Sequence, residues 1–195
     1  MSKRFSNTTS DFIEWSEMLN LVRNLFDDKN YKMSLLIACG SFFGLRISDL
    51  LTLTWEQILN TDYLELIESK TGKKRIVKIN PKLQKHIKNC YTAINPTSVN
   101  SKCFTSQMGT VYSVQRINVV LKEIKGKHNL KIDNFSTHSL RKTFGREVYT
   151  QAGVNSEFAL IKLSELFNHS NTSVTRRYLG IKFEEMMQTY DCLTF

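Results

Sequence analysis

The stretch YKMSLLIACGSFFGLRISDLL, residues 31–51, places an almost wholly apolar segment directly before a glycine and an arginine. Residues 31–43 are apolar nearly all round, which predicts a helix at the centre of the hydrophobic core. After Gly44, a second short helix is expected to begin in the segment RISDLLTL. Arg46 lies in this apolar neighbourhood, three residues before Asp49. Taken alone, that pair is explained by a salt bridge within one helical turn.

Helical patterns dominate on both sides of this stretch. Residues 12–27 carry an amphipathic stripe, and PKLQKHIKNCYTAI begins with Pro81, which suits the first turn of a helix. Further helices are expected at roughly 112–125, 138–151, 156–167 and 172–179. Residues 62–69 and 74–79 are β-type segments around a T-G-K turn and predict a hairpin. The expected fold is therefore α+β and predominantly α-helical, with a small hairpin or three-stranded sheet.

The composition of the 195 residues, 41% hydrophobic and 23% charged, is that of an ordinary globular protein. No apolar run approaches the roughly 20 residues of a membrane span, and the polar N-terminus is unlike a signal peptide, so we expect a cytoplasmic protein that does not bind membranes. The net charge of +9 favours an anionic partner, nucleic acid foremost. The four cysteines show no paired spacing and are interpreted as reduced thiols.

Two further stretches concentrate groups that suit an anionic partner. In HSLRKTFGRE, His138 and Arg141 share one helical face. Both tend to be cationic, so their proximity is unfavourable unless an anion lies between them. In NHSNTSVTRRYLG, Tyr178 follows His169 by nine positions, and two arginines directly precede it. A tyrosine among cations can simply pack, but it can also be a phenol held ready to attack a phosphate.

Together these groups suit chemistry on a phosphodiester. Guanidinium groups bind phosphate oxygens in a bidentate manner and stay charged, so Arg46 and Arg141 can stabilise the charge of the transition state. The phenol of Tyr178, with an ordinary pKa of about 10, becomes a nucleophile when cations and a histidine assist the loss of its proton. Lys70, otherwise a solvated lysine of a hairpin turn, can protonate the departing sugar oxygen. Because the arginines stabilise the charge, no metal and no other cofactor is expected.

The order and local sequence of these groups resemble the tyrosine recombinases, also called phage integrases. The catalytic domain of that family carries an arginine in a G-L-R-x-x-[E/D]-L context, a hairpin lysine, an H-x-x-R motif, a later histidine or tryptophan, and a tyrosine. The corresponding motifs here are GLRISDL, SKTGKKRIV, HSLR, FNHS and RRY, in this order over nearly the whole chain. The resemblance implies the DNA breaking-rejoining enzyme fold, of the Xer-like kind, for the catalytic domain.

The resemblance also implies a metal-independent strand transfer with a role for each residue. Tyr178 would attack a DNA phosphate to form a 3′-phosphotyrosyl intermediate, and Lys70 would protonate the released 5′-oxygen. His138 would act as a general base or acid near the tyrosine, and His169 would hydrogen-bond the phosphate. A 5′-hydroxyl from a partner strand would then reverse the chemistry and join the strands.

Supporting roles are expected for other charged residues. Arg46 and Arg141 would clamp the phosphodiester, and Asp49 would orient either Arg46 or the hairpin lysine. The implied partner is double-stranded DNA that carries recombination sites. The basic residues that either contact the DNA backbone or are merely solvated are Lys142, Arg146, Arg176 and Arg177.

The chain departs from the family pattern at two places. Asn168 replaces the usual glycine before the second histidine, and asparagine tolerates the left-handed conformation well. Typical members also carry an N-terminal helical domain that closes a clamp round the DNA, and no such region precedes residue 10. Two explanations remain open, a catalytic fragment or a minimal recombinase of the kind that inverts short promoters.

The expected organisation is an N-terminal tail (1–10), a catalytic domain (11–180) and a C-terminal helix or tail (181–195). The last segment, KFEEMMQTYDCL, spaces apolar residues along one helical face. These residues either cover the core of their own chain or pack into a neighbouring subunit of a homotetramer on DNA, as in the family.

Two other functions use a similar set of residues. A type IB topoisomerase-like enzyme would nick and close DNA, although the HSLR and RRYLG contexts look more like recombinases. A catalytically silent DNA-binding regulator is the other alternative, although every catalytic position holds a competent residue. Neither the target sequence nor the choice between integration, excision and inversion follows from the sequence.

Overall fold

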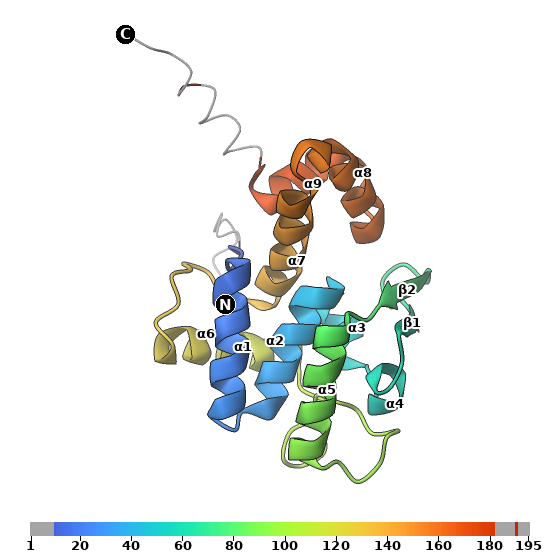
Figure 1. The fold of residues 1–195 in the computed structure, drawn as a ribbon, viewed down its shortest axis with the longest axis vertical. Helices are drawn as coiled ribbons and strands as arrows, with labels where there is room; N and C mark the ends of the chain where they lie inside the picture. The colour runs from blue at the N-terminus through green and yellow to red at the C-terminus, as the bar shows by residue number, and fades with distance from the viewer. Residues whose placement is uncertain (1–9, 182–189, 191–195) are drawn as a thin grey trace. The chain divides into compact units, whose positions relative to one another are not determined.

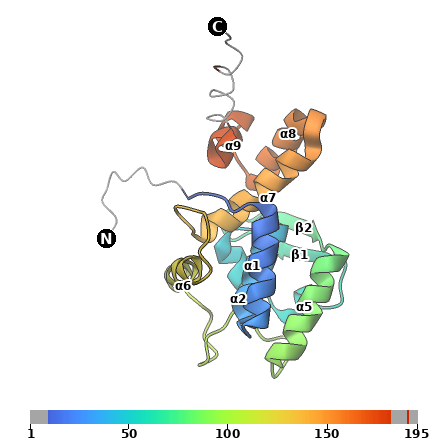
Figure 2. The same ribbon diagram turned by 60° about the vertical axis from the view of Figure 1, so that its left-hand side comes forward.

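The computed structural model describes residues 10–181 and Tyr190. The chain divides into two compact units, of which the first ends at Thr143 and the second begins at Phe144. Figures 1 and 2 show the helices and the small sheet of which the units are made. Within the described residues, no helix is long and apolar enough to cross a membrane.

The first unit is mainly helical. Its helices are α1 (Trp15–Asp27), α2 (Tyr31–Phe43), α3 (Ile47–Leu51), α4 (Trp55–Ile58), α5 (Pro81–Ile94) and α6 (Val114–Lys127). The predictions for 31–43 and 81–94 agree with α2 and α5. The first helix begins at Trp15 rather than at residue 12, because the backbone of Ile13 exchanges hydrogen bonds with the hydroxyl of Thr143.

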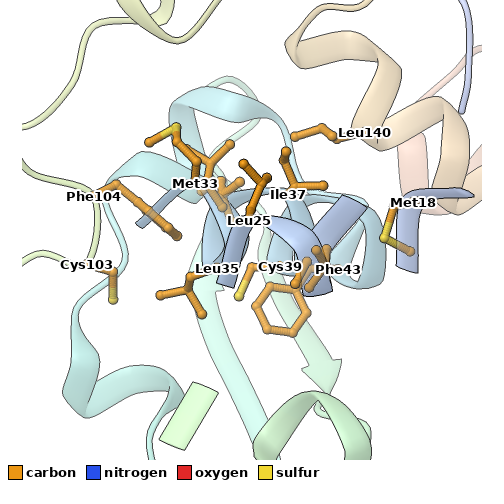
Figure 3. Close-up of a cluster of buried hydrophobic side chains, with 14 of the residues drawn as sticks. Met18, Leu25, Met33, Leu35, Ile37, Cys39, Phe43, Cys103, Phe104 and Leu140 are labelled. Carbon is orange, nitrogen blue, oxygen red and sulfur yellow. The ribbon is translucent and has the colours of Figure 1, made fainter. Parts of the chain in front are cut away.

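Helix α2 forms the centre of the core in the first unit. It lies between α1 and α5 (Figure 1). Nearly all its residues are buried. Figure 3 shows Leu35, Ile37 and Phe43 among buried side chains from neighbouring elements. Burying a side chain of this size contributes about 1.5–3 kcal/mol. The prediction of a central apolar helix is confirmed.

The described cysteines are packing residues. Cys39, Cys90 and Cys103 are free and buried, as predicted, and Cys192 lies outside the described residues. Burial raises the pKa of Cys90 to about 12. The thiol is therefore protonated at neutral pH and behaves as a small apolar group.

The predicted hairpin is formed by β1 (Tyr63–Ile67) and β2 (Lys74–Lys78), which pair antiparallel with Ile67 opposite Lys74. Among the described residues the sheet has two strands, so the three-stranded alternative is not supported. The alternation of side chains turns Arg75 inward, where it is 8% exposed, while Ile67 is 72% exposed. The hairpin thus reverses the usual burial pattern, because it buries a charged side chain and exposes an apolar one.

Helix α7 (Thr137–Ala152) contains the division between the units. In the second unit it is followed by a 3₁₀ turn (Gly153–Asn155), α8 (Ser156–Phe167) and α9 (Thr172–Leu179). Both α8 and α9 agree with the predicted ranges, and Gly180 ends α9 with a φ of 79°, as predicted.

A small apolar core holds the second unit together. Its buried residues are Leu160, Leu163, Phe167, Leu179 and Ile181. Gly145 of α7 permits close packing, because a Cβ atom there would lie 2.6 Å from Leu179 Cδ2 and 3.1 Å from the Phe167 ring. Ile181, the first residue of the expected tail, is thus part of this core. The expected helical stripe that follows it lies outside the described residues, apart from Tyr190.

Candidate active site

The turn that follows α2 anchors two arginine side chains. Gly44 ends the helix in the left-handed conformation, with a φ of 56°. Arg75 Nη2 donates to the carbonyl of Phe43 at 2.9 Å, and Arg141 Nη1 donates to the carbonyl of Gly44 at 2.6 Å. Carbonyls at a helix C-terminus lack helical partners and favour cations through the helix dipole. The end of α2 therefore fixes both guanidinium groups beside the segment that leads into Arg46.

Arg46 directly precedes α3 and forms an ion pair with Glu68, whereas the local sequence pattern offered Asp49 as its partner. Its Nη1 lies 2.6 Å from Glu68 Oε2, with the Arg46 side chain 20% exposed and that of Glu68 1% exposed. Glu68 Oε1 accepts a hydrogen bond from Arg75 Nη1 at 3.1 Å. Burial raises the pKa of Glu68, but hydrogen bonds from Arg46, Thr71 and Arg75 bring it below its ordinary value. Glu68 is therefore an ionised carboxylate between two arginines.

Asp49 ties α3 to the hairpin. Its Oδ1 accepts hydrogen bonds from the backbone N–H of Ser69 at 2.9 Å and from the Ser69 hydroxyl at 2.6 Å. Asp49 is 1% exposed, and its Oδ2 has no hydrogen-bond partner among the residues described. Lys70, the next residue after Ser69, is exposed on the turn. The carboxylate thus lies where it can orient the hairpin lysine, one of the two roles expected of it.

His138 and Arg141 lie one helical turn apart in the first part of α7. The imidazole is exposed, whereas Arg141 is buried. Partial desolvation of the ring, followed by the charges of Arg141 and Lys142, lowers the pKa of His138. The imidazole is therefore neutral at pH 7 and able to accept a proton.

In the second unit, Tyr178 lies edge-on against His169. The ring centroids are 5.3 Å apart at an angle of 71°, and Phe167 packs against both rings. His169 Nδ1 is 2.9 Å from the hydroxyl of Thr175, which is fully buried. Asn168 adopts the left-handed conformation, with a φ of 53°, and ends α8. Its tolerance of that conformation, expected from the sequence, lets the chain turn directly into His169.

The four basic residues expected near the DNA backbone differ in their surroundings. Lys142 is 9% exposed, and its Nζ donates to the carbonyl of Ser10 at 2.6 Å. Arg176 forms an ion pair with Glu157, Arg146 is half-buried, and Arg177 is exposed. The role of these residues in DNA binding stays a prediction.

The predicted catalytic residues fall into two sets, one in each unit. The first unit contains Arg46, Lys70, His138 and Arg141. The second unit contains His169 and Tyr178, whose rings are in contact. Among residues 10–181 and Tyr190, no group of three or more His, Cys, Asp or Glu side chains is placed to hold a metal ion. The residues that sequence reasoning missed are Glu68 and Arg75. The sequence signal that could have identified them is the alternation of side chains along a strand, which places both residues on the inward face that Leu66 also occupies.

Residues 12–185 match the sequence profile of the Phage integrase family. The chain belongs to this family. Probable integrase/recombinase YoeC of Bacillus subtilis is 32% identical over 176 residues, which are 89% of this chain and 91% of YoeC. A tyrosine recombinase of Pseudothermotoga lettingae is 29% identical over 90% of this chain and 58% of that protein. Tyrosine recombinase XerC of Xanthomonas axonopodis is 23% identical over 76% of this chain, but the match covers only 46% of XerC.

Solved structures support the same fold for this integrase-family chain. The crystal structure of XerA recombinase matches with a TM-score of 0.71 at 16% identity, over 100% of this chain and 68% of XerA. The catalytic core of lambda integrase matches with a TM-score of 0.58 at 18% identity, over 80% of this chain and 90% of that core. The tyrosine-recombinase catalytic fold expected from the sequence is confirmed. The family and its named relatives favour a tyrosine recombinase over a topoisomerase or a silent regulator.

Proposed function

We propose that this chain cleaves and rejoins DNA strands at specific sites, with Tyr178 as the nucleophile. The observation that carries the proposal is the placement of Tyr178 edge-on to His169, whose ring is held by the buried hydroxyl of Thr175. A phenol packed in this way keeps a fixed orientation and has an imidazole at its side. The anchored guanidinium groups of Arg46 and Arg141 supply the charge that a phosphodiester needs.

The proposed reaction exchanges one phosphodiester bond for another. The Tyr178 oxygen loses its proton, with His138 as the base, and attacks the phosphorus to form a 3′-phosphotyrosyl bond. The bond from phosphorus to the 5′-oxygen breaks, and that oxygen takes a proton from Lys70. His169, Arg46 and Arg141 stabilise the charge on the phosphate oxygens while the bonds exchange. Attack by the 5′-hydroxyl of another strand restores a phosphodiester and frees Tyr178, so no external energy source is needed.

The proposed partner is duplex DNA in the cytoplasm, with four chains assembled on two sites. XerH and the Tn1549 integrase, which share this fold, have been solved with DNA bound. We propose that the segment after Ile181 links neighbouring subunits in that assembly. Because Ile181 is 1% exposed in the core of the second unit, a truncation that tests the link should begin at residue 182. Such a chain should bind DNA but fail to bring two sites together.

Covalent capture tests the nucleophile and does not require a defined target sequence. The full chain is incubated, without added metal, with duplexes whose sequence is randomised around a nick. After cleavage, the short strand next to the nick dissociates with its 5′-hydroxyl, so the adduct cannot reverse. Adducts that survive denaturation are isolated, their DNA is sequenced, and the modified residue is located by mass spectrometry. The expected result is DNA attached through its 3′-phosphate to Tyr178.

Matched variants decide the outcome. Tyr178→Phe should abolish the adduct, whereas Tyr190→Phe, at a tyrosine that is 64% exposed, should leave it unchanged. Repeating the assay with the chain chemically tethered to the duplex removes weak binding as an explanation. Absence of adduct even with tethered DNA would overturn the proposal. Relaxation of plasmid DNA without sequence preference would instead indicate a topoisomerase.

A further inference from the structure

Glu68 connects two arginines that approach it from different elements. Its Oε2 pairs with Arg46 at 2.6 Å and its Oε1 accepts from Arg75 at 3.1 Å. Glu68 and Arg75 are buried, at 1% and 8% exposure, whereas the Arg46 side chain is 20% exposed. The most accessible member of the cluster is therefore the arginine that the proposed reaction uses.

Arg75 is fixed independently of Arg46. Its Nη2 donates to the carbonyl of Phe43 at the end of α2, and its strand position turns it inward. Glu68 is fixed in turn by the hydroxyl of Thr71, which donates to Oε2 at 3.0 Å. Arg46 thus pairs with a carboxylate whose position and charge are already set by other groups.

The division of charge has a consequence for phosphate binding. A carboxylate that paired with Arg46 alone would hold the guanidinium in place but cancel most of its charge. Arg75 takes part of the charge of Glu68, so Arg46 is held while still attracting an anion. Asp49, the other buried carboxylate nearby, directs its Oδ1 to the donors of Ser69.

We infer that Glu68 and Arg75 are positioning residues that hold Arg46 for the scissile phosphate while leaving it an effective positive charge. This inference rests on the proposed function, in which Arg46 contacts that phosphate. Neither residue touches the DNA in this scheme, and both act through Arg46. Replacing either residue should therefore slow the reaction only to the extent that the rate depends on the negative charge of the scissile phosphate.

A neutral substrate separates this role from simple packing. In a methylphosphonate, a methyl group replaces one charged oxygen of the scissile phosphate, so a guanidinium has less charge to stabilise. The rate of covalent adduct formation is measured on the duplex recovered by capture and on its methylphosphonate counterpart. Arg75→Gln should slow reaction of the phosphodiester about tenfold to a hundredfold, and that of the methylphosphonate far less.

Removing one member of a buried ion pair can prevent folding, so a paired variant is included. Glu68→Gln with Arg75→Gln removes both charges together and keeps the local charge balance. It should fold, as judged by circular dichroism. Its rate of adduct formation should fall as much as that of Arg75→Gln on the phosphodiester, and far less on the methylphosphonate. The control is Glu65→Gln with Lys74→Gln, an exposed ion pair on the same hairpin, which should change neither rate.

The outcomes distinguish the inference from the function on which it rests. Equal losses on both substrates would assign Glu68 and Arg75 to packing, and no loss would leave them without a role; either result overturns the inference. The Arg46→Gln variant serves as the reference for how differently the rates on the two substrates respond when the arginine itself is removed. If that variant reacted equally slowly with both substrates, the proposed role of Arg46 would fail and the inference with it. If Arg46→Gln lost more rate on the phosphodiester than on the methylphosphonate, but the paired variant did not, only the inference would fail.

Discussion

Asp49 and Ser69 are joined by two hydrogen bonds to a single carboxylate oxygen, one from the backbone and one from the hydroxyl of the serine. This relationship connects α3, which begins directly after Arg46, to the residue before Lys70. The hairpin turn is exposed, but its base is thereby fixed to a buried side chain. The position of the proposed general acid thus depends on a residue that need not touch the DNA.

Replacing the leaving group tests this dependence. Lys70→Ala should slow cleavage about a hundredfold or more, because the departing 5′-oxygen lacks a proton donor. Asp49→Ala should slow it about tenfold through the loosened turn. A 5′-bridging sulfur leaves readily without a proton, so it should restore both rates in single-turnover assays. Asp62→Ala, at an exposed aspartate before β1, is the control. Failure of sulfur to rescue Lys70→Ala would contradict the assignment.

The contact between Thr175 and His169 should matter for both stability and rate. Thr175→Val keeps the shape of the buried side chain but removes the hydroxyl that lies 2.9 Å from His169 Nδ1. We expect unfolding to become easier by about 1–3 kcal/mol and adduct formation to slow. Thr175→Ser keeps the hydroxyl and should retain the rate. A valine variant as fast as the native chain would show that this hydrogen bond does not position His169.

Gly145 should not accept even a methyl group. Gly145→Ala would bring a Cβ atom to 2.6 Å from Leu179, the residue after Tyr178. Overpacking of this kind should cost about 1–3 kcal/mol and disturb the nucleophile. Gly126→Ala, in α6 with no atom within 4 Å of the added Cβ, should be neutral or stabilising. Thermal unfolding and adduct formation measure both effects. A Gly145→Ala chain unchanged in both would contradict the close packing of Gly145 against Leu179.

The lowered pKa of His138 predicts the shape of the pH profile. If neutral His138 accepts the proton of Tyr178, the rate should fall only below the ordinary histidine pKa of about 6.5, as His138 becomes protonated. The same shift destabilises the fold in acid, because the unfolded chain binds this proton more readily. Lys142→Gln removes a neighbouring cation and should move both the rate profile and the NMR titration of His138 to higher pH.

Lys122→Gln is the control for that experiment, since it removes an exposed lysine from α6. It should leave the NMR titration of His138 where it is. A rate that instead fell as His138 lost its proton would mean that the protonated ring is the active form.

Local signals explain which parts of the fold could be predicted. Helices α2, α5, α8 and α9 have the predicted bounds, because glycine, asparagine or proline marks their ends. The start of α1 could not be predicted, since it depends on the contact of Ile13 with Thr143, 130 residues away. Short motifs likewise named the candidate catalytic residues, whose roles stay proposals.

The pairing of Arg46 with Glu68 could not be predicted either, for a related reason. A local pattern offered Asp49 as the partner, and only the tertiary placement of the hairpin brings Glu68 into reach. The inward turn of Arg75 contradicts the expectation that strands bury apolar residues and expose charged ones. Continuing the alternation from Leu64 through Leu66 to residue 68 would have revealed the buried carboxylate.

A carboxylate shared by two guanidinium groups also limits how this part of the chain can change during evolution. Replacing Glu68 alone would leave Arg75 buried with its charge uncompensated, and replacing Arg75 alone would leave the buried Glu68 with Arg46 as its one charged partner, whose positive charge it would largely cancel. A lineage that altered one position would be less stable until the other followed. We expect homologous chains to change Glu68 and Arg75 together, while the exposed neighbour Ile67 varies independently of both.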